Sequence, residues 1–522
     1  MTDSNPLRKI NHIVVLMLEN RSFDNLLGWL YDRANEPPFD KVPADFEGLD
    51  CGKFSNQKAD GTIVYAGRTD DPRSPQPNPG EPFQAVYSQV YDTPLTNLKD
   101  VPPDPPGPPN MQGFIRNYAD QKDKPDDPGK IMLSLTPKTV PVLSSLAHHY
   151  AVFDHWFSSI PTQTFCNRSF VHAGTSSGYV NNDGGGFVFV NETPTIFDLL
   201  EAAGKSWTIF CGAWLLESFT LLVQKPLWKY GLTKHFAHLK EFLSAAGKQD
   251  ALPHYSFIEP VYFDSLIWGA HNDMHPECNL YEFFGPSNAH NGEALLWSIY
   301  DAIRNGPNWE DTLLIILFDE HGGCYDHVPP PSSKECAVAI APDDNIIAPG
   351  KPGGCGFKFD RLGPRVPAIA VSAYIAPQTR IHTVFEHTSI LSTVVNCFDL
   401  PKQQLGRRQA VAENISAALN LSRPRSDKPI VPKPKSTLLD DVAAEAHTIT
   451  HWIEAHARLL GAKQKPVSDL QKDALRAATL MTQASDLHQR VEGLKHELEA
   501  DLLLMEFEAK WVRSNIRRAK IQ

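Results

Sequence analysis

Two uninterrupted runs of apolar residues predict central β-strands. Residues 12–18 (HIVVLML) and 313–318 (LLIILF) show no alternation of polar and apolar positions, which is typical of strands covered on both faces of a parallel sheet. A further run at 365–372 (RVPAIAVS) indicates another buried strand, and residues 292–304 have helical spacing. Because helix and strand alternate, the pattern favours an α/β fold with a central, mostly parallel sheet and helices on both faces.

Proline-rich segments divide the chain. Residues 71–109, which include VPPDPPGPP at 101–109, should hold no regular element, because proline lacks an amide donor and fixes φ. We expect a long ordered loop or lid there. Residues 423–435 are rich in proline and basic side chains, and we interpret them as a linker that follows a domain at 1–422.

Beyond the linker, apolar residues recur at steps of three and four, which predicts a helical hairpin or small bundle at 436–522. We expect its apolar stripe to be buried against a partner helix or a second subunit, so that a homo-oligomer is possible, rather than to bind a membrane. The stripe comprises Leu439, Val442, Ala446, Ile449, Ile453, Leu487, Val491, Leu494, Leu498, Leu502 and Met505.

Composition narrows the classes of partner and compartment. The 522 residues carry a net charge of −12, which argues against a nucleic-acid-binding surface but does not exclude lipid substrates. No stretch approaches the roughly 20 apolar residues of a membrane helix, and we identify no signal-peptide pattern. We therefore expect at most peripheral membrane contact. The eight cysteines show no C-x-x-C spacing, so neither a zinc ribbon nor a redox motif is indicated.

Each of the two main apolar runs ends on a pair of oxygen ligands. Glu19 and Asn20 follow the first, and Asp319 and Glu320 follow the second. Ligands of parallel sheets bind beyond the carboxyl ends of the strands, and three carboxylates meeting there would repel one another unless a cation or proton neutralised them. The pattern favours a metal site. The alternative is that each acidic pair is a solvated strand end.

A second chemical motif lies at 158–170 (SSIPTQTFCNRSF). Hydroxyl groups, an amide and a guanidinium occur within a few residues, which suits a nucleophile beside a planar cation that pairs with phosphate oxygens. The alternative is an ordinary turn, in which serine and threonine are common.

Taken together, the motifs resemble those of the bacterial phospholipase C and acid phosphatase AcpA family, to which plant non-specific phospholipases C also belong. The resemblance spans about residues 8–400 and rests on five segments in order along the chain: ENRSFD at 19–24, the nucleophile segment with its preceding DHWF at 154–168, DEHGGCYDHVPP at 319–330, RVP at 365–367 and EHTS at 386–389.

The resemblance implies an alkaline-phosphatase-like α/β fold and hydrolysis of phosphate esters through a covalent intermediate on a hydroxyl. By position, Thr164 would be the nucleophile. Glu19, Asn20, Asp319 and Glu320 would hold one divalent metal, with Thr164 as a further oxygen ligand and Asn20 also acting in catalysis. An all-oxygen shell favours Ca²⁺, Mg²⁺ or Mn²⁺, whereas an added imidazole would favour Zn²⁺.

Three histidines are candidates for catalysis. The family carries an acid-rich D-x-H-P segment after an E-P dipeptide, and here Glu259-Pro260 precedes NDMHP at 272–276. His275 would contact phosphate or protonate the leaving oxygen, because a near-neutral pKa suits that task. His327 and His387 lie in matching motifs, and each would either act in the site or orient a loop.

The sequence departs from the family pattern in three places. No histidine occurs between Asp92 and Asn110, where family members usually carry one. Cys166 replaces the proline expected before Asn167. Family members are usually exported, but we identify no signal-peptide pattern here. Cys166 also fails the C-x-P-x-R pattern of sulfatases. The sequence therefore predicts a metal-dependent phosphoesterase, foremost a phospholipase C acting through phosphothreonine. The alternatives are an acid phosphatase and a catalytically silent binding protein of the same fold.

Overall fold

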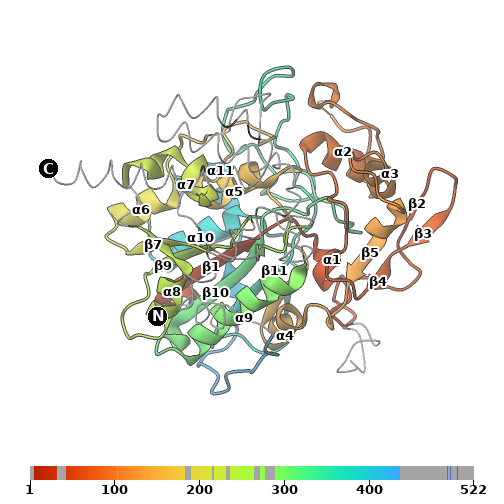
Figure 1. The fold of residues 1–522 in the computed structure, drawn as a ribbon. Coiled ribbons are helices and arrows are strands. Elements are labelled where there is room, and N and C mark those ends of the chain that lie inside the picture. Colours follow the sequence, from red (N-terminus) through yellow and green to blue (C-terminus); the bar gives the residue numbers. More distant parts are fainter. Residues whose placement is uncertain are drawn as a thin grey trace.

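The computed structural model describes residues 5–31, 43–102, 104–182, 190–213, 217–230, 235–263, 271–276 and 288–434, together with Val491, Leu494 and Leu503. Within this part the chain forms a central sheet of eight strands with helices on both sides (Figure 1). The predicted α/β class is confirmed.

The central sheet is mostly parallel. Its strands, in spatial order, are β12 (Thr379–Ile381), β6 (Ala151–Phe153), β11 (Ala368–Val371), β10 (Thr312–Phe318), β1 (His12–Leu18), β9 (Tyr255–Glu259), β7 (Trp207–Cys211) and β8 (Phe236–His238). Only β11 runs antiparallel to its neighbours β10 and β6, and the other described pairs are parallel. The two apolar runs thus lie side by side at the centre of the sheet.

The helices that cover this sheet fall into two groups on its opposite faces (Figure 1). One group contains α4 (Pro141–His149), α8 (Leu239–Ala246) and α9 (Ala289–Asn305). The other contains α5 (Thr164–Ala173), α6 (Ile196–Ala202), α7 (Phe219–Val223), α10 (Thr388–Cys397) and α11 (Gly406–Val411). The described 3₁₀ turns are Pro6–Lys9, Leu98–Asp100, Pro128–Met132, Lys225–Tyr230, Trp309–Asp311 and Ile415–Ala418.

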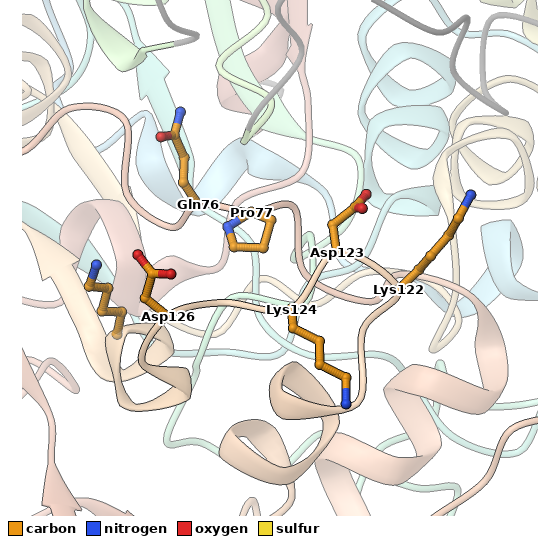
Figure 2. Close-up of a pocket in the computed structure, with 7 residues that line it drawn as sticks. Gln76, Pro77, Lys122, Asp123, Lys124 and Asp126 are labelled. Atoms are coloured by element: carbon orange, nitrogen blue, oxygen red, sulfur yellow. The ribbon is translucent and has the colours of Figure 1, made fainter.

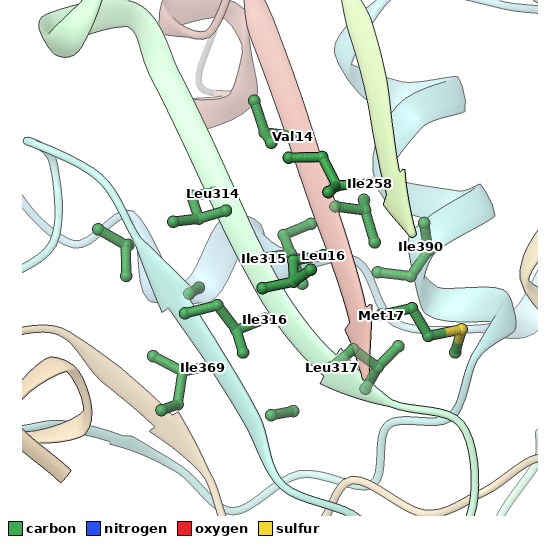
Figure 3. Packing of buried hydrophobic residues seen from close by; sticks show 14 of the residues in the cluster. Val14, Leu16, Met17, Ile258, Leu314, Ile315, Ile316, Leu317, Ile369 and Ile390 are labelled. Carbon is green, nitrogen blue, oxygen red and sulfur yellow. The ribbon is translucent and has the colours of Figure 1, made fainter. Parts of the chain in front are cut away.

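The main hydrophobic core fills both faces of the sheet. Every residue of β10 is buried, as is every residue of β1 after His12, which explains why neither strand alternates polar and apolar positions. Figure 3 shows Val14 and Leu16 of β1 among side chains of β10 and the flanking elements. Each fully buried aliphatic side chain contributes about 1.5–3 kcal/mol to the free energy of folding. The two strands therefore hold the residues that follow them in fixed positions.

A smaller lobe lies beside the carboxyl ends of β1 and β10 (Figure 1). It contains the antiparallel pair β2 (Ser55–Gln57) and β3 (Ile63–Tyr65), the parallel pair β4 (Gly67–Thr69) and β5 (Leu133–Leu135), and the helices α1 (Phe23–Leu27), α2 (Phe83–Tyr91) and α3 (Phe114–Ala119). Helices α2 and α3 contribute Phe83, Phe114 and Tyr118 to a second hydrophobic cluster, whereas Phe23 of α1 and Leu135 of β5 belong to the main core.

The prediction of no regular element within 71–109 was wrong. Helix α2 occupies Phe83–Tyr91, directly after Pro82, which takes the N-cap position. No proline occurs between residues 83 and 91, and the buried faces of Phe83, Val86 and Val90 pack into the second cluster. Composition over a long window therefore concealed a short helix that is buried at every position except Gln84.

The predicted C-terminal bundle lies almost wholly outside the described residues, and the domain boundaries remain a prediction. Val491 and Leu503, from the predicted region, are buried in the main core cluster, and Leu494 packs against it. In the described part of the chain, no helix combines the length and the apolar character needed to cross a bilayer.

Candidate active site

The ends of β1 and β10 bring the predicted acidic side chains together. The two strands pair in register from His12 with Thr312 to Leu18 with Phe318, so Glu19 and Asp319 leave the sheet at equivalent positions. The backbone N–H of Asn20 donates to Oδ1 of Asp319 at 3.0 Å. Glu19, Asn20, Asp319 and Glu320 are all fully buried, so the alternative of solvated strand ends does not hold.

Arg168 of α5 binds the carboxylates from the other side. Its Nε donates to Oε1 of Glu19 at 3.0 Å, and its Nη2 donates to the same oxygen. The Nε atom also lies 3.6 Å from Oδ2 of Asp319. From the sequence, this guanidinium was expected to pair with phosphate oxygens, but the structure places it against Glu19 and Asp319. It therefore acts as a fixed counter-charge inside the protein.

The acidic cluster, which consists of Glu19, Asp319 and Glu320 with Asn20 beside them, contains buried oxygen atoms that accept no hydrogen bond. Burial raises the pKa of Glu19 well above its usual range, with the Asp319 carboxylate raising it further. Burial also raises the pKa values of Asp319 and Glu320. Three buried oxygens, Oδ1 of Asn20, Oδ2 of Asp319 and Oε1 of Glu320, accept no hydrogen bond. Such orphaned acceptors fit a cation as a partner.

Thr164 reaches the same cluster from the start of α5. It is the first residue of that helix and is 1% exposed. Its hydroxyl donates to Oε2 of Glu19 at 3.4 Å, while Arg168 occupies Oε1. One carboxylate thus divides its two oxygens between a guanidinium and the predicted nucleophile.

His275 also lies at the cluster. Its Nδ1 lies 2.6 Å from the carbonyl oxygen of Pro276, and its Nε2 lies 2.9 Å from Nδ2 of Asn20. A proton on Nδ1 satisfies the first contact and leaves Nε2 directed at the acidic cluster. The structure therefore brings His275 together with the predicted ligands.

Glu81 is a residue of this site that the sequence did not reveal. Its Oε1 lies 3.3 Å from Nε2 of His275 and accepts a hydrogen bond from Asn78 at 2.8 Å. The Glu81 carboxylate is also a cause, after burial, of the raised pKa of Glu320. Glu81 comes from the proline-rich segment, where no motif or spacing marked it.

His387 supports the site from behind. Its Nε2 donates to the carbonyl oxygen of Asp319 at 2.6 Å, and its Nδ1 accepts from the indole of Trp156 at 3.4 Å. Burial lowers the pKa of His387 to about 4. With both ring nitrogens engaged, the imidazole is neutral and orients the turn after β10, which matches the second of the two roles considered for it.

His327 belongs to a separate cluster. Its Nδ1 lies 2.7 Å from Oδ2 of Asp24, and its ring lies 3.9 Å from that of Phe54. In the described part of the chain, one group of three histidine, cysteine, aspartate or glutamate side chains has its ligand atoms all within 4.8 Å of one another. This group consists of Asp24, Asp326 and His327. A group that could hold a metal is therefore present there, and the strand-end carboxylates are not in it.

Arg365 already pairs with both carboxylates of this second group and offsets one of their two negative charges. It donates to Oδ1 of Asp24 and to Oδ1 of Asp326, each at 2.9 Å. The remaining oxygens accept from the main chain or from His327: Oδ2 of Asp24 from His327, and Oδ2 of Asp326 from the backbone N–H of Asp24. None of these acceptors is orphaned, so the group fits an ion-pair network better than a metal site.

A surface pocket lies beside the loop that leads to Glu81. It has a volume of about 580 Å³ and is lined by Gln76, Pro77, Lys122, Asp123, Lys124, Asp126 and Lys130 (Figure 2). None of the predicted site residues lines it. Its mixed lysine and aspartate lining is typical of a solvated surface, so the chemistry of the acidic cluster remains the better guide to function.

The sequence of this chain is similar to those of known phosphoesterases. The sequence profile of the Phosphoesterase family matches residues 10–401. The chain is 34% identical to non-specific phospholipase C3 of Arabidopsis thaliana over 430 residues, covering 81% of this chain and 75% of the relative. It is 27% identical to phospholipase C B of Mycobacterium tuberculosis over 469 residues, covering 83% and 82%.

A solved structure of a protein in the alkaline phosphatase superfamily from Vibrio parahaemolyticus matches 63% of this chain and 80% of its own, at 9% identity and a TM-score of 0.28. A score this low supports no residue-by-residue comparison. The family match covers the strand ends, the nucleophile segment and the ion-pair network alike, and it confirms the resemblance seen in the motifs. The chain belongs to the Phosphoesterase family.

Proposed function

We propose that the protein hydrolyses phospholipids in the manner of a phospholipase C, through a phosphothreonine at Thr164. Family membership makes it a phosphoric ester hydrolase, and the relatives named non-specific phospholipase C and phospholipase C B support the lipid substrate. The observation that carries the proposal is the buried Thr164 hydroxyl beside Oε2 of Glu19. A hydroxyl nucleophile requires a neighbouring acceptor for its proton.

A single divalent cation fits the charge of the site. Glu19, Asp319 and Glu320 bring three negative charges when ionised, and Arg168 offsets one of them. We propose that these carboxylates and the side-chain oxygen of Asn20 hold the ion, with Thr164 beside it. Oxygen donors favour Ca²⁺, Mg²⁺ or Mn²⁺. A bound ion would lower the pKa of the Thr164 hydroxyl and stabilise negative charge on the phosphoryl oxygens.

The side chains account for each proton in the proposed reaction. Oγ1 of Thr164 attacks phosphorus, its proton passes to Oε2 of Glu19, and the bond from phosphorus to the leaving oxygen breaks. That oxygen takes a proton from Nε2 of His275, for which the imidazole must be protonated, with its Nε2–H directed at Oε1 of Glu81 instead of accepting from the Asn20 amide. Water then attacks the phosphothreonine and gives a proton back to His275, while Thr164 recovers its own proton from Glu19.

Two aryl substrates and one lipid test this proposal. We expect hydrolysis of 4-nitrophenyl phosphorylcholine, loss of that activity with EDTA and recovery with excess Ca²⁺, Mg²⁺ or Mn²⁺. Phosphatidylcholine vesicles should yield diacylglycerol and phosphocholine. Preference for 4-nitrophenyl phosphate over the diester would instead indicate a phosphatase. Absence of hydrolysis with every metal and substrate would indicate a binding protein of the same fold.

A further inference from the structure

Glu259, at the end of β9, has no role in the reaction above, although it belongs to the E-P dipeptide that the sequence singled out. Its buried carboxylate gathers donors from two segments. Oε1 accepts from the backbone N–H and the hydroxyl of Thr220, each at 3.0 Å, and from the hydroxyl of Tyr262 at 3.2 Å. Oε2 accepts from the hydroxyl of Ser218. Glu259 therefore fixes the start of α7 and the turn after β9 relative to each other.

The two segments that Glu259 joins each carry an aromatic ring. Phe219 and Tyr262 stack with their centroids 3.8 Å apart and their planes 10° apart. The guanidinium carbon of Arg168 lies 5.0 Å from the centroid of Tyr262 and 5.7 Å from that of Phe219. Both rings are nearly or fully buried. An aromatic ring at this distance attracts a guanidinium, and the attraction is stronger where water is excluded.

The position of Arg168 determines how Glu19 faces the nucleophile. Both of its hydrogen bonds to Glu19 end on Oε1, which leaves Oε2 directed at the hydroxyl of Thr164. Rotation of the guanidinium away from Glu19 would free the carboxylate to turn. A chain of contacts thus runs from the stacked rings through Arg168 and Glu19 to Thr164.

We propose that Tyr262 and Phe219, held by Glu259, are positioning residues that fix Arg168 and thereby set the orientation of Glu19 toward Thr164. This inference rests on the proposed function of Thr164 as nucleophile. It gives the E-P segment a task in the reaction even though none of its side chains contacts the reacting atoms.

Three variants separate positioning from general stability. Tyr262→Leu removes the ring, Tyr262→Phe keeps the ring and removes the hydroxyl, and Tyr300→Leu removes a buried tyrosine that hydrogen-bonds to Tyr150 away from the site. Each would be purified as the full chain and assayed on 4-nitrophenyl phosphorylcholine with saturating Mn²⁺. Crystal structures of the wild type and Tyr262→Leu would report the contact between Arg168 and Glu19 independently of activity.

For Tyr262→Leu we expect kcat to fall roughly 10-fold to 100-fold, as for a misplaced reacting group, while KM changes by no more than about 2-fold. Tyr262→Phe should recover most of the lost kcat, and Tyr300→Leu should keep wild-type kcat. The crystal structure should show the Arg168 bond to Oε1 of Glu19 broken or lengthened.

Wild-type kcat in a folded Tyr262→Leu variant, or an unchanged Arg168–Glu19 contact, would overturn the inference. An equal loss in Tyr262→Leu and Tyr300→Leu would also overturn it, because it would show a general effect on packing. An inactive wild type would refute the proposed function, and the crystallographic comparison would still decide the positioning of Arg168.

Discussion

The backbone N–H of Asn20 and Oδ1 of Asp319 form a 3.0 Å hydrogen bond that joins the ends of the two central strands. Asn20 adopts a left-handed conformation with φ of 54°. Gly322 closes the turn on the other side, where an added Cβ would lie 2.0 Å from the carbonyl oxygen of Asn20. The strand ends are thus tied together by the Asn20 backbone, which contacts the Asp319 carboxylate and Gly322.

The first prediction distinguishes the two acidic groups as metal sites. Asp319→Asn should lose most of the bound metal, because it removes a charge from the cluster with orphaned acceptors. Asp24→Asn should keep it, because Arg365 already pairs with both carboxylates of that group and their oxygens all accept hydrogen bonds. Inductively coupled plasma mass spectrometry on dialysed protein measures metal per chain. Retention in Asp319→Asn together with loss in Asp24→Asn would assign the ion to the second group.

The second prediction concerns the ion-pair network itself. Arg365→Met should destabilise the protein by about 3–5 kcal/mol, because it leaves two buried carboxylates without their partner. Arg380→Met removes a more exposed pair with Asp45 and should cost no more than about 1 kcal/mol. Urea denaturation of both variants measures the difference. Equal stability of the two would show that the network contributes little.

The third prediction concerns Glu81. Replacing Glu81 by Gln should slow hydrolysis of phosphatidylcholine by roughly 10²-fold, because the carboxylate stabilises the protonated His275 that serves the leaving oxygen. The loss should be much smaller with a 4-nitrophenyl leaving group, which needs no proton. Glu192→Gln, on a surface pair with Lys225, is the control. An equal loss on both substrates would rule out a role in leaving-group protonation.

The fourth prediction concerns pH and stability. Burial lowers the pKa of His148 to about 4, below the value of about 6.5 in an unfolded chain. The unfolded state therefore binds the proton first, so the stability that His148 contributes is present above pH 6.5 and is lost as the pH falls toward 4. His148→Gln should weaken this dependence, as measured by urea midpoints from pH 7 to pH 4. An unchanged slope would contradict it.

The sequence correctly predicted where the two central strands end, because the apolar run that forms each strand is continuous in the sequence. Uninterrupted apolar runs identify buried parallel strands, and the register of neighbouring strands brings the residues after them to one edge of the sheet. Glu19 and Asp319 could be paired on that basis alone. Thr164 of the segment at 158–170 also lies beside Glu19, and its role as nucleophile remains a prediction.

Other parts of the site depend on contacts that no sequence spacing encodes. Glu81 reaches His275 because Gln89 donates to the carbonyl oxygen of Gly80 at 2.7 Å and Tyr118 donates to that of Pro77 at 2.7 Å, which anchors an otherwise irregular loop. A proline-rich composition reveals none of these bonds.

Arg168 illustrates the same limit. Its place beside a threonine suggested a phosphate ligand, because guanidinium groups suit both phosphate and carboxylate. Only the three-dimensional structure, in which Arg168 reaches the carbonyl oxygen of Met17 and the carboxylate of Glu19, determines which anion it meets. His387 likewise lies in a matching motif, but the carbonyl oxygen of Asp319 and the indole of Trp156 occupy its two nitrogens.

The fifth prediction concerns the nucleophile and tests the central claim through hydroxyl chemistry. Thr164→Val keeps the branched shape and removes the oxygen, so the protein should fold while turnover falls by about 10³-fold or more. Thr164→Ser should retain part of the activity. Thr312→Val, at the far end of β10, removes another buried hydroxyl and should keep full turnover.

The most direct measurement is rapid acid quench of the wild type during turnover of 4-nitrophenyl phosphorylcholine, followed by peptide mass spectrometry. The account predicts a phosphorylcholine adduct on Thr164 that is absent in Thr164→Val. An adduct on another residue, or normal turnover in Thr164→Val with no adduct at all, would contradict it and indicate direct attack by water.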